Sequence, residues 1–222
     1  MDEIRLIEVK EGILSENDRI ATELRKKLAE KKIFLMNLMA SPGAGKTTLI
    51  IRTLEALKER FDIGVIEADI DSMVDAEKVA ALGIKTVQLR TRGLCHLDAT
   101  MVTDGLSALD MDNFELIIIE NVGNLVCPAE FDTGATLNAM ILSVPEGDDK
   151  PLKYPLMFKM CDVLLINKID YLPYSDFNIG LLKERVMGLK PDMTIFEVSS
   201  RTGQGIGEWT EWLAARVKNF QI

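Results

Sequence analysis

The segment from 40 to 48 constrains the fold of this chain more than any other; it reads Ala-Ser-Pro-Gly-Ala-Gly-Lys-Thr-Thr. An apolar run over 33–39 precedes it, and apolar side chains over 49–54 follow at helical spacing. Strand, glycine-rich turn and helix are the context that a phosphate-binding P-loop requires. The backbone N–H groups of such a turn and the N-terminus of the following helix both face an anion. The segment therefore predicts a nucleoside phosphate site, rather than a glycine turn without a ligand.

Within this P-loop, Lys46 is placed to reach the β- and γ-phosphates, and the Thr47 hydroxyl is placed to bind Mg²⁺. The other loop residues that we expect to contact nucleotide are Gly43, Ala44, Gly45 and Thr48. The common pattern G-x-x-x-x-G-K-[ST] begins with glycine, whereas this chain has Ala40. The methyl group requires an ordinary φ at that residue. Because the rest of the pattern is intact, we expect a functional loop.

Apolar segments alternate with amphipathic ones along the rest of the chain. The expected strands are 33–39, 62–69, 84–89, 114–120, 138–144, 163–167 and 193–198. The expected helices are 46–60, 73–82, 98–109, 154–160, 175–188 and 205–219. Such alternation predicts an α/β fold, here a single P-loop NTPase domain with a mostly parallel central sheet and helices on both faces. Ligands of such folds bind at the carboxyl ends of the strands.

The N-terminal region is predicted to be an accessory segment. Residues 1–10 are expected to form a short strand or an irregular arm, and a helix is expected from Ser15, which can cap it. Ile20, Leu24 and Leu28 give that helix one apolar face, which could cover the sheet or meet a partner. We therefore divide the chain into an arm and amphipathic helix over 1–32, packed on a nucleotide-binding domain over 33–222.

Composition excludes several classes of function. The 222 residues are 47% hydrophobic, which suits one globular domain with a full core. The net charge of −9 and the absence of a Lys/Arg-dense run argue against binding to nucleic acid. No apolar run approaches the roughly 20 residues of a membrane span, and the charged N-terminus does not resemble a signal peptide. We expect a cytoplasmic protein with no membrane or nucleic-acid partner.

The sequence Asn-Lys-Ile-Asp at 167–170, directly after an apolar strand, identifies the base as guanine. The Asp170 carboxylate can accept hydrogen bonds from guanine N1–H and the 2-amino group, whereas adenine presents the opposite pattern. Lys168 can lay its stem along the ribose and base, and Asn167 belongs to the same motif. Polar residues after the last expected strand are a third nucleotide contact: Ser199, Ser200 and Arg201. The predicted ligands are GTP and GDP, with Mg²⁺.

Acids at the ends of buried strands suggest how Mg²⁺ is held. Glu120 ends the strand over 114–120, and Gly123 follows at a position that can approach the γ-phosphate. Asp69 and Asp75 are expected to complete the Mg²⁺ shell with Thr47 and Glu120, although Asp71 or Asp75 could instead only cap a helix. We place Lys46, Thr47 and Gly123 in the hydrolytic centre. No general base is identifiable.

Cys95, His96 and Cys127 form a second candidate site. Two thiolates and one imidazole suit Zn²⁺ or Ni²⁺. Three ligands from one chain leave a coordination position open, as in a transfer site or a site shared across a dimer. The alternative is that these cysteines are buried packing residues, which is the interpretation we give to Cys161. Because Cys127 follows Gly123 closely, γ-phosphate contact and metal coordination would be mechanically connected.

Together these motifs resemble the HypB family of hydrogenase nickel-incorporation GTPases. The resemblance runs from about residue 10 onward and includes Glu-Ala-Asp at 67–69; its most specific stretch is Val-Gly-Asn-Leu-Val-Cys-Pro at 122–128. It implies a GTPase of the signal-recognition and partition-ATPase class that forms a nucleotide-dependent homodimer. It also implies delivery of Ni²⁺ to the large subunit of [NiFe]-hydrogenase together with a second nickel accessory protein. Zn²⁺ or Ni²⁺ would bind at Cys95, His96 and Cys127, near the dimer interface.

The resemblance leaves some points open. A lysine after strand 138–144 would contact nucleotide across the dimer, and Lys150 and Lys153 are both candidates. The chain has neither the N-terminal cysteine motif nor the His-rich stretch of some members, which argues against tight nickel binding and storage. Ala40, which replaces the usual first glycine of the P-loop, is a second departure from the family pattern.

Two other functions are compatible with parts of the sequence. One is a related GTPase chaperone for urease or a cobalamin-dependent mutase; urease-type members place Cys-Pro-His in the metal loop, whereas no His follows Cys127-Pro128 here. The other is a P-loop kinase for a small metabolite, which would prefer ATP. Asp170 argues against the kinase.

Overall fold

A parallel seven-stranded sheet forms the centre of the molecule. The computed structural model describes residues 9–69 and 74–222. In chain order the strands are β1 (Phe34–Ala40), β2 (Ile63–Asp69), β3 (Lys85–Arg90), β4 (Leu116–Glu120), β5 (Leu137–Ser143), β6 (Val163–Asn167) and β7 (Thr194–Glu197). Their order across the sheet is β3-β2-β4-β1-β5-β6-β7, and every pairing is parallel. The predicted α/β fold is therefore confirmed, with the P-loop strand at the centre.

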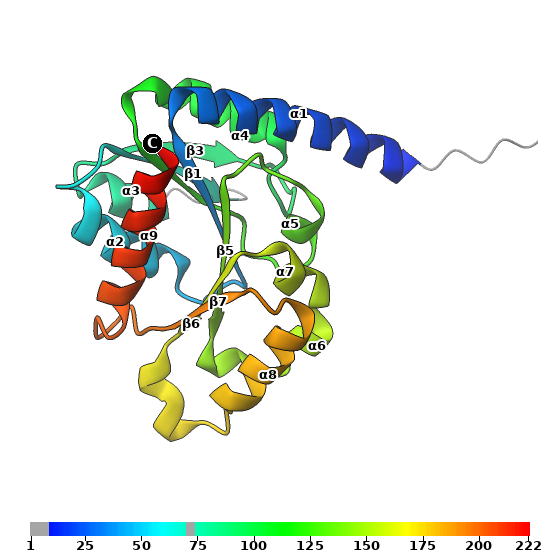
Figure 1. Cartoon of the computed structure of the whole chain (residues 1–222), viewed down its shortest axis with the longest axis vertical. Coiled ribbons are helices and arrows are strands. Elements are labelled where there is room, and N and C mark those ends of the chain that lie inside the picture. Colours follow the sequence, from blue (N-terminus) through cyan, green and yellow to red (C-terminus); the bar gives the residue numbers. More distant parts are fainter. Residues whose placement is uncertain (1–8, 70–73) are drawn as a thin grey trace, which may run out of the picture.

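Helices cover both faces of the sheet (Figure 1). The longer ones are α1 (Val9–Lys31), α2 (Lys46–Leu57), α4 (Ala99–Leu109), α8 (Ile179–Leu189) and α9 (Ile206–Phe220). Shorter ones are α3 (Val74–Ala80), α5 (Cys127–Glu130), α6 (Lys150–Lys153) and α7 (Pro155–Met160). One apolar cluster joins one side of the sheet to α2, α3 and α9. Two further clusters contain the alternate residues of β1: one includes α1 and α4, and the other includes α5, α7 and α8.

The alternation of side chains along β1 shows how one strand serves both layers. Phe34, Met36 and Leu38 point toward α2 and α9, whereas Leu35 packs with α1 and α4 and Met39 packs with α7. Successive side chains of a strand point to opposite faces, so a strand covered on both sides is apolar along most of its length. Asn37 is the polar exception in β1, and its amide is hydrogen-bonded to Asn138 and Asn121. All seven residues of β1 are buried.

The N-terminal helix differs from the prediction in its starting point. Within the described residues, α1 already includes Val9, so the expectation of a non-helical arm is wrong for residues 9 and 10; residues 1–8 lie outside the description. Ser15 lies inside the helix, and its hydroxyl donates to the Gly12 carbonyl instead of capping a first turn. The predicted apolar face is confirmed, because Leu24 and Leu28 are buried against α4 and the sheet.

Several short helical elements were not expected from the sequence. Among them, helix α5 begins at Cys127, α6 lies between the expected strand 138–144 and the expected helix 154–160, and a 3-10 segment (Ile169–Tyr174) delays α8 to Ile179. Each is only one or two turns long, too short to show a helical period in the sequence.

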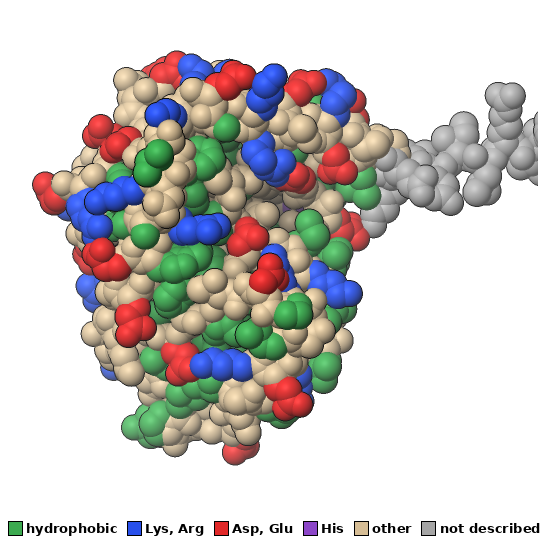
Figure 2. Space-filling model, in the orientation of Figure 1, with side chains coloured by type: hydrophobic (Ala, Val, Ile, Leu, Met, Phe, Trp, Pro, Cys, Tyr) green, Lys and Arg blue, Asp and Glu red, His purple; other side chains and the backbone are tan. Residues whose placement is uncertain are grey.

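Charges of both signs are distributed over the surface. Figure 2 shows Lys and Arg side chains dispersed among Asp and Glu side chains on the face in view. Among the described residues, no helix is long and apolar enough to cross a bilayer.

Helix α9 is attached to the P-loop helix α2 by a buried hydrogen bond. The Trp209 indole Nε1 donates to the Thr53 Oγ1 over 3.0 Å, and both side chains are buried. The Thr53 hydroxyl in turn donates to the Leu49 carbonyl over 2.8 Å. A buried donor that loses its acceptor costs more than the bond itself contributes.

We therefore predict that Thr53→Val lowers the free energy of unfolding by about 1–3 kcal/mol, because the Trp209 N–H loses its acceptor in a space of unchanged volume. Chemical denaturation followed by tryptophan fluorescence measures the change. Thr53→Ser is the matched control, since it keeps the hydroxyl. Equal losses in both variants would contradict the assigned role of the bond.

Candidate functional site

A cavity of about 310 Å³ opens at the carboxyl ends of the central strands. It is lined by Pro42, Gly43 and Lys46 of the P-loop and by Glu67, Glu120 and Gly123. A second cavity of about 220 Å³ adjoins it, around Lys46, Thr47 and Thr48. Polar groups of the central strands β2 and β4 thus converge on the start of α2, as parallel topology requires.

The P-loop has the backbone that its glycines predict. Gly43 and Gly45 have φ of 75° and 101°, in the left-handed region that favours glycine. A Cβ on Gly45 would lie 2.6 Å from the Asn167 Nδ2, so the side chain of the second motif packs directly on the loop. Ala40 is part of β1, without a positive φ, so its methyl group is accommodated there.

The Asn167 side chain connects the P-loop to the loop over 199–201. Its Nδ2 donates to the Ala44 carbonyl over 2.9 Å, and its Oδ1 accepts from the Ser200 N–H and hydroxyl, each over 3.1 Å. Lys168 has a φ of 60° and donates from Nζ to the Gly43 carbonyl over 2.7 Å. Three segments that are far apart in the sequence are therefore joined at one point.

Asp170 is held by the same loop. The Ser199 hydroxyl donates to the Asp170 Oδ1 over 2.6 Å, and the Arg201 guanidinium lies 3.7 Å from Oδ2. The Arg52 Nε of α2 donates to the Ser200 carbonyl over 3.0 Å. All the residues that the sequence suggested for base recognition therefore lie together, beside the P-loop.

Two buried carboxyl groups face each other at the floor of the cavity. Glu67 on β2 is in register with Glu120 on β4, and both are buried. The Thr47 Oγ1 donates to the Glu120 Oε1 over 2.9 Å, while Glu67 Oε1 and Glu120 Oε2 have no hydrogen-bond partner. Burial first, and then the neighbouring Glu120, raises the pKa of Glu67 to about 10. Burial likewise raises the pKa of Glu120.

This arrangement fits Mg²⁺. Oxygen atoms buried without a partner are costly, and a hard divalent cation supplies the missing interaction. Glu67 was absent from our sequence-based list of site residues, although its place beside Asp69 at the end of an apolar strand was a signal that could have found it. Gln88 of β3 is in register with Glu67, and its Nε2 is buried without a partner.

The two candidate aspartates also line the cavity. Asp75, on α3, lines both cavities and pairs with Lys78 over 2.7 Å. Asp69 ends β2 and lines the larger one. Asp71, which could have been a helix cap, lies outside the described residues.

Gly123 touches the P-loop, where a side chain would be crowded against Pro42. A Cβ at this position would lie 3.1 Å from the Pro42 backbone nitrogen. Asn121, just before it, is buried, and its Nδ2 donates to the Asn37 Oδ1 over 3.0 Å. The segment after β4 is therefore fixed at Asn121 and closely packed at Gly123.

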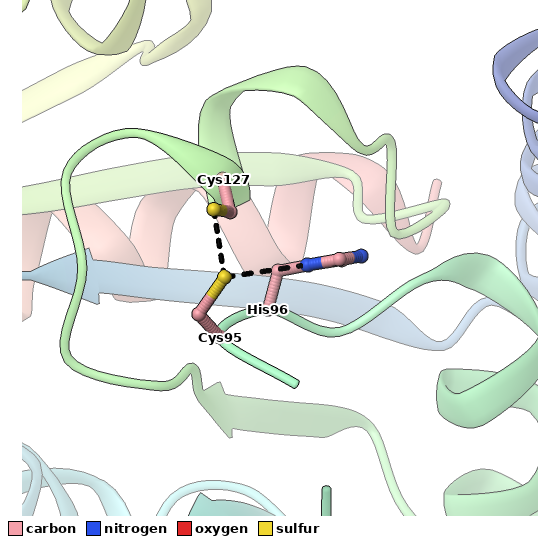
Figure 3. Close-up of side chains that lie close together, drawn as sticks. All are labelled: Cys95, His96 and Cys127. Carbon is pink, nitrogen blue, oxygen red and sulfur yellow. Dashed lines mark hydrogen bonds between the residues drawn. The ribbon is translucent and has the colours of Figure 1, made fainter. Parts of the chain in front are cut away.

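Cys95, His96 and Cys127 form a cluster whose potential ligand atoms all lie within 4.8 Å of one another (Figure 3). The Cys95 Sγ donates to the Cys127 Sγ over 2.7 Å, and the His96 Nδ1 lies 3.9 Å from the Cys95 Sγ. The His96 ring stacks on Phe131 with centroids 3.8 Å apart. Burial lowers the pKa of His96, which favours the neutral imidazole that binds metals.

The donor set suits a borderline metal such as Zn²⁺ or Ni²⁺. The hydrogen bond that it shares with Cys95, followed by burial, favours the protonated thiol of Cys127 and raises its pKa, so metal binding would have to release a proton from that thiol. Cys161, by contrast, is fully buried in the apolar cluster below α7, as expected for a packing residue.

A single short segment connects the two sites. Glu120 and Gly123 line the phosphate cavity, and Cys127 of the metal cluster begins α5 only four residues after Gly123. Between them, the Asn124 Nδ2 donates to the Cys95 carbonyl over 3.3 Å, and its Oδ1 accepts from the Val126 N–H. The two sites are therefore connected by one short, continuous stretch of backbone.

The two lysines that could reach a partner's nucleotide lie next to each other at α6. Lys153 pairs with Asp149 over 2.5 Å, and the Lys150 Nζ lies 5.7 Å from the centre of the Tyr154 ring. This placement does not decide between them.

Comparison with known proteins gives consistent matches. Residues 34–197 match the family described as CobW/HypB/UreG, nucleotide-binding domain. The hydrogenase maturation factor HypB of Azotobacter vinelandii is 45% identical over 96% of this chain and 70% of its own length. The hydrogenase/urease maturation factor HypB of Helicobacter hepaticus is 40% identical over 97% of this chain and 90% of its own length. The crystal structure of HypB from Helicobacter pylori in complex with nickel has a TM-score of 0.86 and 36% identity, and the match covers 93% of this chain and 98% of that one.

The Glu67 carboxyl group predicts how stability depends on pH in protein free of metal and nucleotide. Because its pKa is raised from 4.5 to about 10 on folding, the native state keeps a proton that the unfolded chain releases. Its stabilising contribution is present below pH 4.5 and is lost as the pH rises toward 10, by at most about 1.4 kcal/mol per pH unit.

Glu67→Gln cannot lose this proton, so its free energy of unfolding should fall less steeply with pH than that of the wild type. Denaturant titrations at several pH values across this range measure the slopes. Glu77→Gln, at an exposed site on α3, is the control and should follow the wild type. Parallel profiles for Glu67→Gln and the wild type would contradict the assignment.

Proposed function

The chain belongs to the HypB hydrogenase maturation factors of the CobW/HypB/UreG family, and we propose that it is a GTP-hydrolysing metallochaperone for nickel insertion into [NiFe]-hydrogenase. The observation that carries the proposal is the shared segment from Glu120 to Cys127. It begins in the cavity beside the P-loop and ends in the Cys/His cluster. Occupancy of one site can therefore alter the geometry of the other.

Guanine recognition is supported by the surroundings of Asp170. Its carboxylate is directed by Ser199 and lies near Arg201, next to the Asn167 side chain that contacts the P-loop. A carboxylate in this position accepts hydrogen bonds from guanine N1–H and the 2-amino group, whereas adenine would present the N1 acceptor to it and could donate no hydrogen bond there. We propose GTP and GDP as the nucleotides, and this argues against a kinase that uses ATP.

The proposed reaction is attack of water on the γ-phosphate of GTP, which gives GDP and phosphate. Lys46 would hold charge on the β- and γ-phosphates, and the N–H groups of Gly43, Gly45 and Thr48 would contact their oxygens. Gly123, packed on Pro42, would sense the γ-phosphate. The residues that would hold Mg²⁺ are Thr47, Asp69, Asp75 and Glu120, together with Glu67, which lies beside Glu120. Mg²⁺ supplies charge neutralisation on the triphosphate.

The Cys95–His96–Cys127 cluster is the proposed site for the metal cargo. Three ligands leave one coordination position for a donor from another molecule. We propose that this donor is supplied in a homodimer or by a second nickel accessory protein, before transfer to the hydrogenase large subunit. The nickel complex of the Helicobacter pylori relative supports Ni²⁺ as the cargo, and the chemistry of the ligands is also compatible with Zn²⁺.

Hydrolysis would set the lifetime of the dimer. Loss of the γ-phosphate would release Gly123, and movement of Gly123 would reposition Cys127 through the residues between them. Lys150 or Lys153 would reach the nucleotide of the second protomer.

Urease is a second candidate client. The relative from Helicobacter hepaticus is named a hydrogenase/urease maturation factor and is similar over nearly the whole of both chains. Deletion of the gene, followed by separate assays of hydrogenase and urease, distinguishes the two clients.

Guanine selectivity gives the first test. The wild type should bind a fluorescent GTP analogue more tightly than the ATP analogue. Asp170→Asn should weaken GTP binding by roughly 10- to 100-fold, because two hydrogen bonds to a charged acceptor are replaced. Asp176→Asn, an exposed acid nearby in the chain, is the control. Equal affinity of the wild type for both analogues would refute the guanine assignment.

Metal titration with GDP and with a non-hydrolysable GTP analogue gives the second test. The affinity for Ni²⁺ should differ between the two nucleotide states, and the GTP analogue should promote dimers in size-exclusion chromatography. Cys95→Ala combined with Cys127→Ala should abolish stoichiometric binding, whereas Cys161→Ala should retain it. Unchanged binding in the double variant would exclude this metal site; identical affinities in both states would exclude the coupling.

A further inference from the structure

Asn17 of α1 lies between the two segments that carry the Cys/His cluster. Its Oδ1 accepts from the Ala99 N–H over 2.9 Å, and its Nδ2 donates to the Asp132 carbonyl over 2.9 Å. The residue is buried, with 6% of its surface exposed. One amide therefore satisfies a backbone donor and a backbone acceptor that belong to different parts of the chain.

Both bonds lie close to the cluster in the sequence. Ala99 is the first residue of α4 and comes three residues after His96. Asp132 comes five residues after Cys127 and directly after Phe131, on which the His96 ring stacks. Asn17 thus joins the segment that contains Cys95 and His96 to the segment that contains Cys127.

A second side chain of α1 holds one of these segments. The Arg25 guanidinium donates from Nη2 to both carboxylate oxygens of Asp132, over 2.7 and 2.8 Å, and from Nε to the Ala135 carbonyl over 3.2 Å. Arg25 lies eight residues after Asn17, so two turns of one helix separate the two attachments. A rigid helix spanning both fixes the direction in which residues 131–135 leave α5.

We propose that α1 is the positioning element of the Cys95–His96–Cys127 cluster, and that Asn17 is the residue that sets the separation of its two halves. The inference rests on the metal site of the proposed function. Ligands must be held close to their bonding geometry before the metal arrives, and elements around them supply that order. The predicted role of the N-terminal helix thereby changes from a cover for the sheet to a support for a site.

The test uses Asn17→Leu, which keeps the branched outline of the side chain but forms neither bond, and Asn17→Ala. The matched control is Leu28→Ala, which removes packing of α1 on the core and leaves both Asn17 bonds in place. Two properties of the full-length protein are measured. The first is Ni²⁺ affinity, with the thiolate-to-nickel charge-transfer spectrum. The second, in metal-free protein, is the rate at which oxidised glutathione converts Cys95 and Cys127 to a disulfide.

Both Asn17 variants are expected to weaken Ni²⁺ binding by about 10- to 100-fold, the usual effect of removing a group that orients metal ligands. They should also shift the charge-transfer band and slow disulfide formation several-fold, while Leu28→Ala matches the wild type in all three. Wild-type behaviour of the Asn17 variants would overturn the proposal. Equal losses in Leu28→Ala would also overturn it, because they would show that general loosening of α1 is sufficient.

The design separates this inference from the proposed function. If the Cys127→Ala variant binds Ni²⁺ as tightly as the wild type does, the proposed metal site itself is wrong. The disulfide rate in metal-free protein then decides the positioning role alone: slower closure in the Asn17 variants supports it, and an unchanged rate refutes it.

Discussion

A chain of buried amides in the centre of the sheet fixes the segment on which both candidate sites depend. Asn37, in the middle of β1, donates to the Asn138 Oδ1 of β5 and accepts from the Asn121 Nδ2, over 3.1 and 3.0 Å. Asn121 in turn accepts from the Val122 N–H. A polar side chain inside an apolar layer must find its partners within the protein, and a fully paired amide allows few arrangements. The backbone after β4 is therefore anchored just before it reaches the P-loop.

The fold was predictable wherever the signal was local. The P-loop implied a strand, a turn and a helix, and continuous apolar runs such as 114–119 implied strands covered on both faces. The order of the strands was not predictable, because it depends on pairings between segments far apart in the chain. The start of α1 was misplaced since Ser15 looks like a cap, whereas its hydroxyl bonds back within the helix.

In the candidate site, too, residues with a local signal in the sequence were predictable, and residues whose role depends on a distant partner were not. Motifs whose chemistry is contained in a few adjacent residues placed Lys46, Asp170 and Cys127 correctly beside their expected neighbours, although their roles remain predictions. Glu67 and Asn17 were missed because the role of each depends on a partner that is distant in the sequence. Glu67 matters through its register with Glu120, and Asn17 through backbone groups 82 and 115 residues away. No short pattern encodes such a relation.

The long reach of Asn17 also has a consequence for the order of assembly during synthesis. Helix α1 is made first, yet the groups that its amide joins follow 82 and 115 residues later. Cys95 and Cys127 themselves are 32 residues apart. Because synthesis proceeds from the N-terminus, α1 is present before either of the segments that Asn17 joins. The bond from Asn17 to the Asp132 carbonyl can therefore form only after both cysteines have been added to the chain.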